Sequence, residues 1–290
     1  MCREKAGGQD EMRMLRAMYA EGEERLRQAG IEEAGLDAWY LLEFATGISK
    51  ASYYGDPDKE IKEEEAARYL GYIEIRKSRI PLQHITKEQA FMGYPFYVDE
   101  HVLIPRQDTE TLVEEALKVL KPGMQVLDLC TGSGCILISL MKMCKGLYGT
   151  GSDISEDALE VARKNACRLE VNAAFIRSSL FEHISGRYDL IVSNPPYIPT
   201  SVIEGLQEEV RLYDPFIALD GKEDGLYFYR EIIKAGIRYL RPEGYLMFEI
   251  GYDQGNEVAC LMEKQGYRNI LVKKDLAGLD RVVSGMYNGE

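Results

Sequence analysis

The sequence is poor in the side chains that build metal sites. It contains three histidines, His84, His101 and His183, and these stand far apart along the chain. None of the six cysteines forms a C-x-x-C pair or a cluster with a histidine. Because a zinc site needs about four converging nitrogen or sulfur ligands, we expect no metal ion. We interpret the cysteines as free, buried thiols.

Long apolar runs and an excess of positive charge are also missing. No apolar run approaches the roughly 20 residues that cross a bilayer, and the first residues lack the apolar segment of a secretory signal. We therefore expect a cytoplasmic protein without membrane contact. Asp and Glu number 48 against 35 Lys and Arg, which gives a net charge of −13. Because nucleic-acid binders usually present a basic face to phosphates, we expect proteins or small molecules as partners and no direct nucleic acid. We also expect a monomer.

The pattern of apolar residues changes along the chain. Residues 1–82 place apolar side chains at helical spacing among charges, which predicts a small helical domain. Residues 83–105 contain two short apolar runs around Gly93 and Pro95, which predicts a β-hairpin linking two domains. Over residues 106–290, strand-like and helical patterns alternate, which predicts a mostly parallel sheet with helices on both faces. The strand-like runs lie at 126–129, 147–152, 174–177, 190–193, 245–250, 270–272 and 282–286.

The first strand-like run leads into a turn of small residues. The turn consists of Cys130, Thr131, Gly132, Ser133 and Gly134. Small residues at the start of a helix let backbone N–H groups approach a ligand closely. Asp153 ends the next strand-like run about 20 residues later, where a carboxylate can accept hydrogen bonds from both hydroxyls of a ribose. The pattern predicts a nucleoside-containing cofactor, and a dinucleotide-dependent dehydrogenase would share it.

A second motif follows the strand-like run at 188–193. It reads Asn194, Pro195, Pro196 and Tyr197. Two consecutive prolines end strand pairing and fix the backbone. The Asn194 side-chain oxygen and the Pro195 carbonyl can both accept hydrogen bonds from a planar NH2 group, and Tyr197 can stack on it. Positioning of this kind helps a weakly nucleophilic nitrogen to attack a sulfonium methyl group, because orientation lowers the barrier and carbonyl dipoles stabilise the developing positive charge.

With these motifs the chain resembles the protein-(glutamine-N5) methyltransferases that modify bacterial peptide chain release factors. The shared stretches reach from residue 81 to residue 281. They are 81–85, 91–96, 102–106, Thr109-Glu110, Leu127-Asp128, 131–134, 153–155, 193–198, 224–226, 249–251, 274–278 and Asp280-Arg281. The Asn-Pro-Pro-Tyr motif also occurs in adenine-N6 methyltransferases, whereas the other stretches are more particular to the glutamine enzymes.

The resemblance implies a fold, a cofactor and a substrate. The fold would be a class I S-adenosylmethionine-dependent methyltransferase domain with a seven-stranded, mostly parallel sheet, preceded by a helical domain that recognises the release factor. The substrate would be the glutamine of the Gly-Gly-Gln motif. The cofactor would contact residues 130–134, Asp153, Ser179, Leu180 and Asn194. The catalytic residues would be Asn194, Pro195 and Tyr197, with Pro196 completing the glutamine site.

Three positions depart from the family pattern. Cys130 replaces the first glycine of the turn, so its Cβ must be tolerated near the cofactor. Ser178-Ser179-Leu180 stands where the family often has an acid that contacts adenine, and it offers hydroxyls and an apolar side chain instead. Gln107-Asp108 replaces the usual Pro-Glu, a change that retains an acid.

Three other functions compete with glutamine methylation. An adenine-N6 methyltransferase would need a basic groove and aromatic stacking platforms for an extruded base, which the acidic balance disfavours. A module that only binds the cofactor and docks on a partner would have no need for the complete Asn194–Tyr197 motif. A dehydrogenase would have no use for the double-proline corner.

Overall fold

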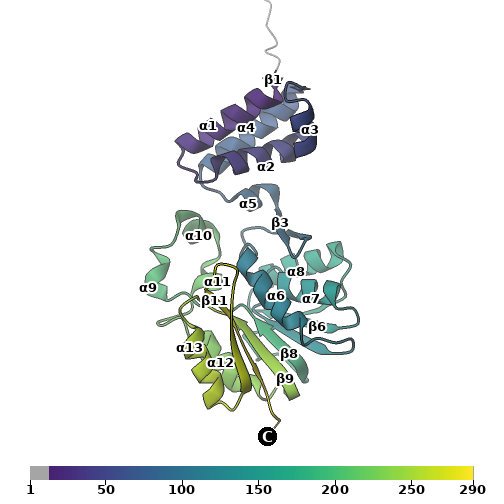
Figure 1. The fold of residues 1–290 in the computed structure, drawn as a ribbon, viewed down its shortest axis with the longest axis vertical. Helices are drawn as coiled ribbons and strands as arrows, with labels where there is room; N and C mark the ends of the chain where they lie inside the picture. Colours follow the sequence, from purple (N-terminus) through teal and green to yellow (C-terminus); the bar gives the residue numbers. More distant parts are fainter. Residues whose placement is uncertain (1–12, 290) are drawn as a thin grey trace, which may run out of the picture. The chain divides into compact units, whose positions relative to one another are not determined.

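The computed structural model describes residues 13–289 (Figure 1). The chain forms two compact units that divide between Thr86 and Lys87. The hairpin that we expected as a linker lies in the second unit. No helix among residues 13–289 combines the length and apolar character needed to span a bilayer.

The first unit is helical, as expected. Its core contains fully buried side chains from three helices, among them Leu15, Leu41 and Ile73, and the Arg76 guanidinium donates a 2.7 Å hydrogen bond to the buried Asp37 carboxylate. The long helices are α1 (Leu15–Gln28), α2 (Ala34–Thr46) and α4 (Glu63–Lys77). The shorter elements, which the sequence analysis did not predict, are α3 (Lys50–Gly55), α5 (Leu82–Thr86), β1 (Arg13–Met14) and β2 (Glu60–Ile61).

The second unit is built on a seven-stranded sheet, which confirms the predicted fold class. The strand order is β10-β11-β9-β8-β5-β6-β7; β11 runs antiparallel to β10 and β9, and the other neighbouring pairs are parallel. The strands are β5 (Gln125–Leu129), β6 (Tyr148–Asp153), β7 (Ala174–Arg177), β8 (Tyr188–Ser193), β9 (Leu240–Glu249), β10 (Arg268–Lys274) and β11 (Asp280–Met286). The chain extends the sheet from β5 to β7 on one side and then returns to place β8 on the other side of β5. Such a topological switch point is where ligands bind in open α/β sheets.

Helices cover both faces of the sheet (Figure 1). On one face Val126, Val192 and Met247 pack against α6, α7 and α8, whereas on the other face Leu127 and Ile191 pack against α12 and α13. Adjacent residues such as Val126 and Leu127 serve opposite faces because side chains alternate along a strand. The helices are α6 (Glu110–Leu117), α7 (Cys135–Met143), α8 (Glu156–Arg168), α12 (Tyr227–Gly236) and α13 (Gly255–Lys264).

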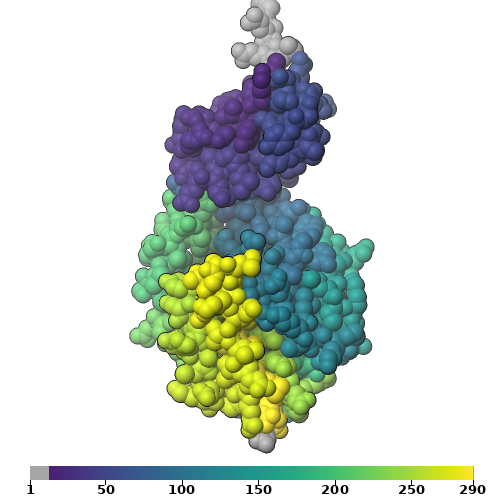
Figure 2. Space-filling model, in the orientation of Figure 1, coloured from purple at the N-terminus to yellow at the C-terminus, as the bar shows by residue number. Residues whose placement is uncertain are grey.

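Two further segments of the second unit contact helices that cover the sheet. The hairpin β3 (Glu88–Phe91) and β4 (Tyr94–Tyr97) is fixed to α8, because the Asn165 side chain accepts a hydrogen bond from the Tyr97 backbone N–H and donates one to the Tyr97 carbonyl. The C-terminal strands, yellow in Figure 2, lie at the surface beside the segment near residue 110. There the Lys273 ammonium lies 3.8 Å from the Glu115 carboxylate.

Three short helices follow the Asn-Pro-Pro-Tyr motif, and the sequence analysis did not predict them. They are α9 (Thr200–Ile203), α10 (Glu208–Tyr213) and α11 (Phe216–Leu219). The segment leaves and returns at one place, because Ile198 pairs with Asp220 and the Thr200 N–H donates to the Lys222 carbonyl. Residues 200–219 therefore form a closed excursion from the sheet.

Candidate active site

A pocket of about 290 Å³ opens at the carboxyl ends of β5, β6 and β8. Its volume is close to the lower limit of about 300 Å³ that is typical of small-molecule sites. The predicted site residues that line it are Cys130, Thr131, Gly132, Ser133, Asp153, Ser179, Leu180, Asn194 and Pro196. Gly134, Pro195 and Tyr197 are not among its lining residues. The fold thus brings predicted site residues that are up to 66 positions apart to one cavity.

The glycine turn runs from the end of β5 into α7. Gly132 and Gly134 have left-handed φ angles of 52° and 78°, which glycine adopts without strain. A Cβ atom at Gly134 would lie 2.9 Å from Ile138 Cδ1 and 3.2 Å from Ala162 Cβ, so glycine there lets α7 approach α8. At Gly132 a Cβ atom would meet nothing within 4 Å, because the turn faces open space. The turn therefore exposes its backbone to a ligand at Gly132 and packs closely against α8 at Gly134.

Cys130 occupies a glycine-like conformation, since its φ is 59°. An L-residue in this region carries a strain of roughly 1–2 kcal/mol. Strain of this kind gathers at functional sites because the surrounding structure enforces it. Leu180, with φ 49°, is a second strained residue in the pocket wall. Cys130 therefore adopts a backbone conformation that favours the glycine of the family pattern.

Asp153 ends β6 and holds the glycine turn from the opposite side. Its carboxylate accepts 3.0 Å hydrogen bonds from the Gly132 and Ser155 backbone N–H groups. Burial raises the pKa of Asp153, and these hydrogen bonds oppose that rise. A carboxylate has about four acceptor positions, and the backbone N–H groups of Gly132, Ser155 and Ile154 leave at least one for a ligand in the pocket that Asp153 lines. Asp153 can therefore order the turn and bind hydroxyl groups together.

The turn at 178–180 forms the wall beyond β7. The buried Ser178 hydroxyl donates a 2.8 Å hydrogen bond to the Leu180 carbonyl and accepts one of 3.0 Å from the His183 backbone N–H. Ser178 thereby fixes the turn, while Ser179 and Leu180 also line the pocket. This wall presents a hydroxyl and an apolar surface, and it holds no carboxylate for an adenine amino group.

Asn194 is the polar group at the other side of the pocket. It follows β8, where the buried Ser193 hydroxyl donates a 2.7 Å hydrogen bond to the Leu129 carbonyl and so ties β8 to β5 just before the motif. Among the residues that the structure describes, none forms a hydrogen bond with the Asn194 side chain. Pro195 and Pro196 are buried. A rigid corner thus leaves an amide group free to bind a ligand.

Sequence reasoning assigned no role to a third part of the wall. Arg106 and Thr109 line the pocket on one side, and Pro215 and Ile217 of the 200–219 excursion line it on the other. The Arg106 guanidinium donates a 2.6 Å hydrogen bond to the buried carboxylate of Asp214 and holds the two sides together. Burial raises the pKa of Asp214, and Arg106 opposes that rise. The only available signal was that 102–106 belongs to the resemblance, because no spacing rule connects Arg106 with a residue 108 positions later.

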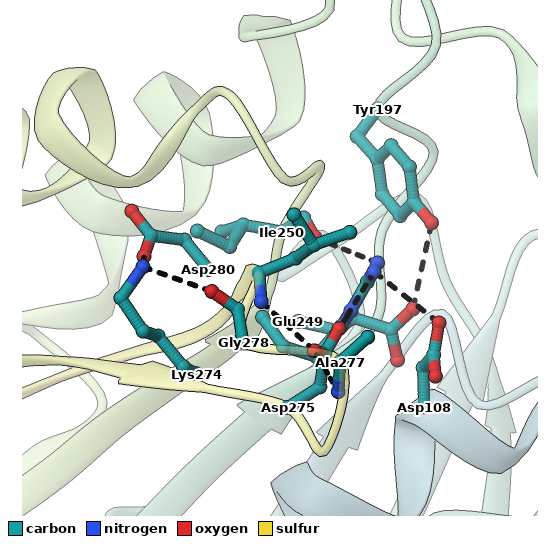
Figure 3. Close-up of polar contacts among 11 residues, drawn as sticks. Asp108, Tyr197, Glu249, Ile250, Lys274, Asp275, Ala277, Gly278 and Asp280 are labelled. Carbon is teal, nitrogen blue, oxygen red and sulfur yellow. Dashed lines mark hydrogen bonds and ion pairs between the residues drawn. The ribbon is translucent and has the colours of Figure 1, made fainter.

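The Tyr197 hydroxyl faces a buried polar network around Glu249 (Figure 3). Its hydroxyl lies 3.5 Å from Glu249 Oε1 at the end of β9. Burial raises the pKa of Tyr197, and the nearby Glu249 carboxylate adds to the rise. Burial also raises the pKa of Glu249 to about 7, opposed by Thr109 and Arg281. Tyr197 is thus a neutral donor at physiological pH.

No metal centre accompanies this pocket in the part of the chain from residue 13 to residue 289, where no group of three or more His, Cys, Asp or Glu side chains could hold an ion. The five described cysteines are free thiols. The expectation that they are buried is only partly correct, because Cys135 is buried whereas Cys167 and Cys260 are exposed.

Known families match both units of the chain. Residues 17–86 match the PrmC N-terminal domain, and residues 107–274 match the methyltransferase small domain. The release factor glutamine methyltransferase of Geobacter sulfurreducens is 43% identical over 261 residues, which cover 90% of this chain and 92% of that protein. The release factor glutamine methyltransferase of Caulobacter vibrioides is 40% identical over 275 residues, which cover 93% and 95%.

The fold is also found among solved structures. The crystal structure of a methyltransferase from Pyrococcus furiosus matches with a TM-score of 0.53 at 17% sequence identity, over 71% of this chain and 94% of that chain. At this identity the similarity concerns the fold alone.

Proposed function

Because the chain belongs to the release factor glutamine methyltransferase family, we propose that it methylates the N5 side-chain nitrogen of the glutamine in the Gly-Gly-Gln motif of peptide chain release factors. The methyl donor is S-adenosylmethionine. The helical unit recognises the release factor, and the protein acts as a monomer in the cytoplasm. A bound release factor brings its glutamine to the Asn194 side of the pocket.

The residues on the β5–β6 side of the pocket fit the cofactor. Gly132 leaves open space at the turn, and Asp153 retains at least one acceptor position for ribose hydroxyls. Ile154 and Leu180 offer apolar surface to an adenine ring. When bound, S-adenosylmethionine supplies an electrophilic methyl group on a positively charged sulfur. Asp153 would place an acidic group, and the glycine turn uncharged backbone, on the side of the pocket that would hold the cofactor.

The free Asn194 side chain is the observation that carries the proposal. Its oxygen is available to accept a hydrogen bond from the glutamine NH2 group, because no described residue occupies it. The Pro195 carbonyl is the second acceptor in this proposal, and proline in the next position, Pro196, keeps the backbone from rotating. Two acceptors in one plane orient the amide nitrogen, and such orientation contributes several kcal/mol to catalysis.

These residues do not remove a proton before methyl transfer in our proposal. An amide nitrogen becomes strongly acidic once it is alkylated, so its proton leaves to water. The Asn194 oxygen and the Pro195 carbonyl instead stabilise the positive charge that develops on nitrogen. S-adenosylmethionine, when bound, would supply the methyl group and keep the electron pair of the carbon–sulfur bond, while the nitrogen lone pair would form the new bond to carbon.

Methylation of adenine is the alternative that the acidic surface disfavours. The unit that holds the pocket, from Lys87 onward, contains 22 basic and 31 acidic residues. Binding to nucleic acid gains most of its affinity from neutralised phosphates, and this charge balance opposes it.

Transfer of a labelled methyl group from S-adenosylmethionine tests the proposed function. We expect label on a release factor and none on a release factor whose Gly-Gly-Gln glutamine is replaced by alanine. Peptide mass spectrometry then places the added methyl group on the glutamine side chain. Label on oligonucleotides alone, or equal label on the alanine variant, would refute the proposal.

A further inference from the structure

The backbone at Tyr197 is fixed by contacts that do not involve its side chain. The Gln254 Nε2 atom donates a 3.0 Å hydrogen bond to the Tyr197 carbonyl. The Gln254 Oε1 atom in turn accepts a 3.0 Å hydrogen bond from the Gly251 N–H. A Cβ atom at Gly225 would lie 2.3 Å from the Tyr197 carbonyl oxygen, so this backbone is tightly enclosed. The ring can therefore change position only by rotation of the side chain.

Glu249 is the acceptor for the hydroxyl at the far end of that ring. In the parallel pair of β8 and β9, Ser193 is opposite Phe248, so Glu249 ends its strand where the Asn-Pro-Pro-Tyr motif begins. Glu249 is 2% exposed. Its Oε1 lies 3.5 Å from the Tyr197 hydroxyl, and its Oε2 has no hydrogen-bond partner among the described residues. The distance is long for a hydrogen bond, and such contacts often shorten when a substrate binds.

Charged groups surround Glu249 from several elements (Figure 3). The guanidinium of Arg281, in β11, contributes the attractive charge, but it is shared with Asp275 at 3.1 Å and with Asp108 at 3.2 Å. The Arg281 guanidinium also donates a 3.3 Å hydrogen bond to the Ile250 carbonyl. Tyr229, in α12, donates to the Glu249 carbonyl oxygen at 3.0 Å. Glu249 is therefore a buried carboxyl with incomplete charge compensation.

We propose that Glu249 is a positioning residue for methyl transfer, which fixes the Tyr197 ring beside the acceptor glutamine by accepting its hydroxyl hydrogen bond. This inference rests on the proposed function, and it adds that the Tyr197 ring stacks on the glutamine amide. Glu249 touches neither substrate nor cofactor in this proposal. Its effect on the reaction passes through Tyr197.

The ionisation of Glu249 sets the strength of this contact. An ionised carboxylate accepts a hydrogen bond about twice as strong as a neutral group does. Burial raises the pKa of Glu249 to about 7, whereas the pKa of Tyr197 is raised beyond the range of the experiment, so Tyr197 stays protonated. Deprotonation of Glu249 therefore strengthens the contact. The kcat/KM for the release factor should rise as the pH increases through about 7.

A double-mutant cycle separates positioning from a general loss of structure. The variants are Glu249→Gln, Tyr197→Phe and the combination of both. At pH 8 we expect Glu249→Gln to lower kcat/KM for the release factor about tenfold, as for loss of a hydrogen bond to a charged group, with an unchanged Kd for S-adenosylmethionine. The double variant should match Tyr197→Phe, because residues that act through one contact do not have additive effects. Additive losses would overturn the proposal.

Asp189→Asn is the matched control. Asp189, at the start of β8, is a partly buried carboxylate that accepts a 2.7 Å hydrogen bond from the Gln125 N–H and pairs with Arg241 at 2.8 Å. It has no contact with Tyr197 in the structure. We expect Asp189→Asn to retain the rise of kcat/KM with pH and Glu249→Gln to lose it. A rise that persists in Glu249→Gln would contradict the positioning role.

A spectroscopic measurement tests the contact without any methyl transfer. In protein with ¹³C-labelled tyrosine ring carbons, the Tyr197 resonance is identified by its loss in Tyr197→Phe. We expect this resonance to titrate near pH 7 in the wild-type protein and in Asp189→Asn, and to stay constant in Glu249→Gln. If the wild type transfers no label to a release factor but the resonance titrates, the proposed function fails and the contact stands. If the Tyr197 resonance has the same pH dependence in the wild type and in Glu249→Gln, the positioning role is refuted whatever the activity.

Discussion

Two buried carboxyl groups support the two sides of the pocket, and they differ in how far their partners lie along the chain. Asp128 in β5 and Glu249 in β9 flank β8 from either side. Burial raises the pKa of each to about 7, and each has one oxygen without a hydrogen-bond partner among the described residues. Asp128 accepts a 2.6 Å hydrogen bond from the hydroxyl of Thr131, three positions later. Glu249 accepts from Tyr197, 52 positions earlier.

The cofactor side of the pocket is built from residues that are close in sequence, whereas the acceptor side is assembled from segments that are far apart in sequence. Asp128 and Thr131 shape the glycine turn within one strand–turn–helix segment, so the cofactor side follows from neighbouring residues. The acceptor side needs β8, the turn after β9, and β11 to meet before Tyr197 is held. We therefore expect variants on the two sides to affect different steps.

Asn194→Ala should produce the largest effect, on the acceptor side. Loss of one preorganised polar group in an active site typically lowers kcat by roughly 100- to 1,000-fold. We expect such a loss in release-factor methylation, with the Kd for S-adenosylmethionine changed by less than about threefold, because Asp153 and the turn remain. Steady-state kinetics and calorimetric titration measure the two quantities. Turnover near the wild-type level would remove the amide-binding role of Asn194.

Asp153→Ala should produce the opposite pattern on the cofactor side. Hydrogen bonds to a charged group contribute about 1.5–3 kcal/mol, so we expect the Kd for S-adenosylmethionine to rise roughly 10- to 100-fold. At saturating cofactor, kcat should fall much less than in Asn194→Ala. Calorimetric titration gives the Kd, and circular dichroism checks that the fold persists. A loss of kcat with unchanged Kd would erase the distinction between the two sides.

Asp128→Asn should change the pH dependence of stability. The folded protein keeps the Asp128 proton up to about pH 7, whereas an unfolded chain releases it near pH 4. The free energy of unfolding therefore falls as the pH rises between these values. The variant removes this contribution. We therefore expect its free energy of unfolding, relative to that of the wild type, to increase by about 2 kcal/mol between pH 5 and pH 8. Urea unfolding at pH 5 and pH 8 tests this, with Asp189→Asn as the control. An equal dependence of the free energy of unfolding on pH in Asp128→Asn and the wild type would contradict the prediction.

Cys130→Gly should have the smallest effect, and it should be stabilising. A side chain at φ 59° carries strain that glycine relieves. Since glycine also gives the unfolded chain more freedom, we expect a net increase of about 1 kcal/mol or less in the free energy of unfolding. Thermal unfolding measures it. A clear decrease would mean that the packing of the Cys130 thiol outweighs the strain of its backbone.

Much of the cofactor side could be predicted from the sequence. The alternation of strand-like and helical patterns correctly predicted the seven strands of the sheet, because periods of 2 and 3.6 residues are local properties of the chain. The glycine turn and Asp153 lie at the ends of adjacent parallel strands, so their proximity follows from the fold class. The sequence also showed that Cys130 replaces a glycine of the turn, but its positive φ was found only in the structure.

The sequence did not predict the excursion at 200–219 or its contact with the rest of the pocket. Its three helices span four to six residues each, too short for helical periodicity to be recognised. Their stability depends on contacts such as that of Asp214 with Arg106, which lie 108 positions apart. Such a contact leaves no spacing that a single sequence can reveal.

The fold class, the glycine turn and the rigidity of the Asn-Pro-Pro-Tyr corner follow from local sequence. Each of these depends on backbone preferences and on residues that are close along the chain. That Asn194 keeps its amide free and that Tyr197 faces Glu249 became clear from the folded chain alone. Those outcomes depend on burial and on the charges that surround a group in three dimensions, and both are set when distant strands pack together.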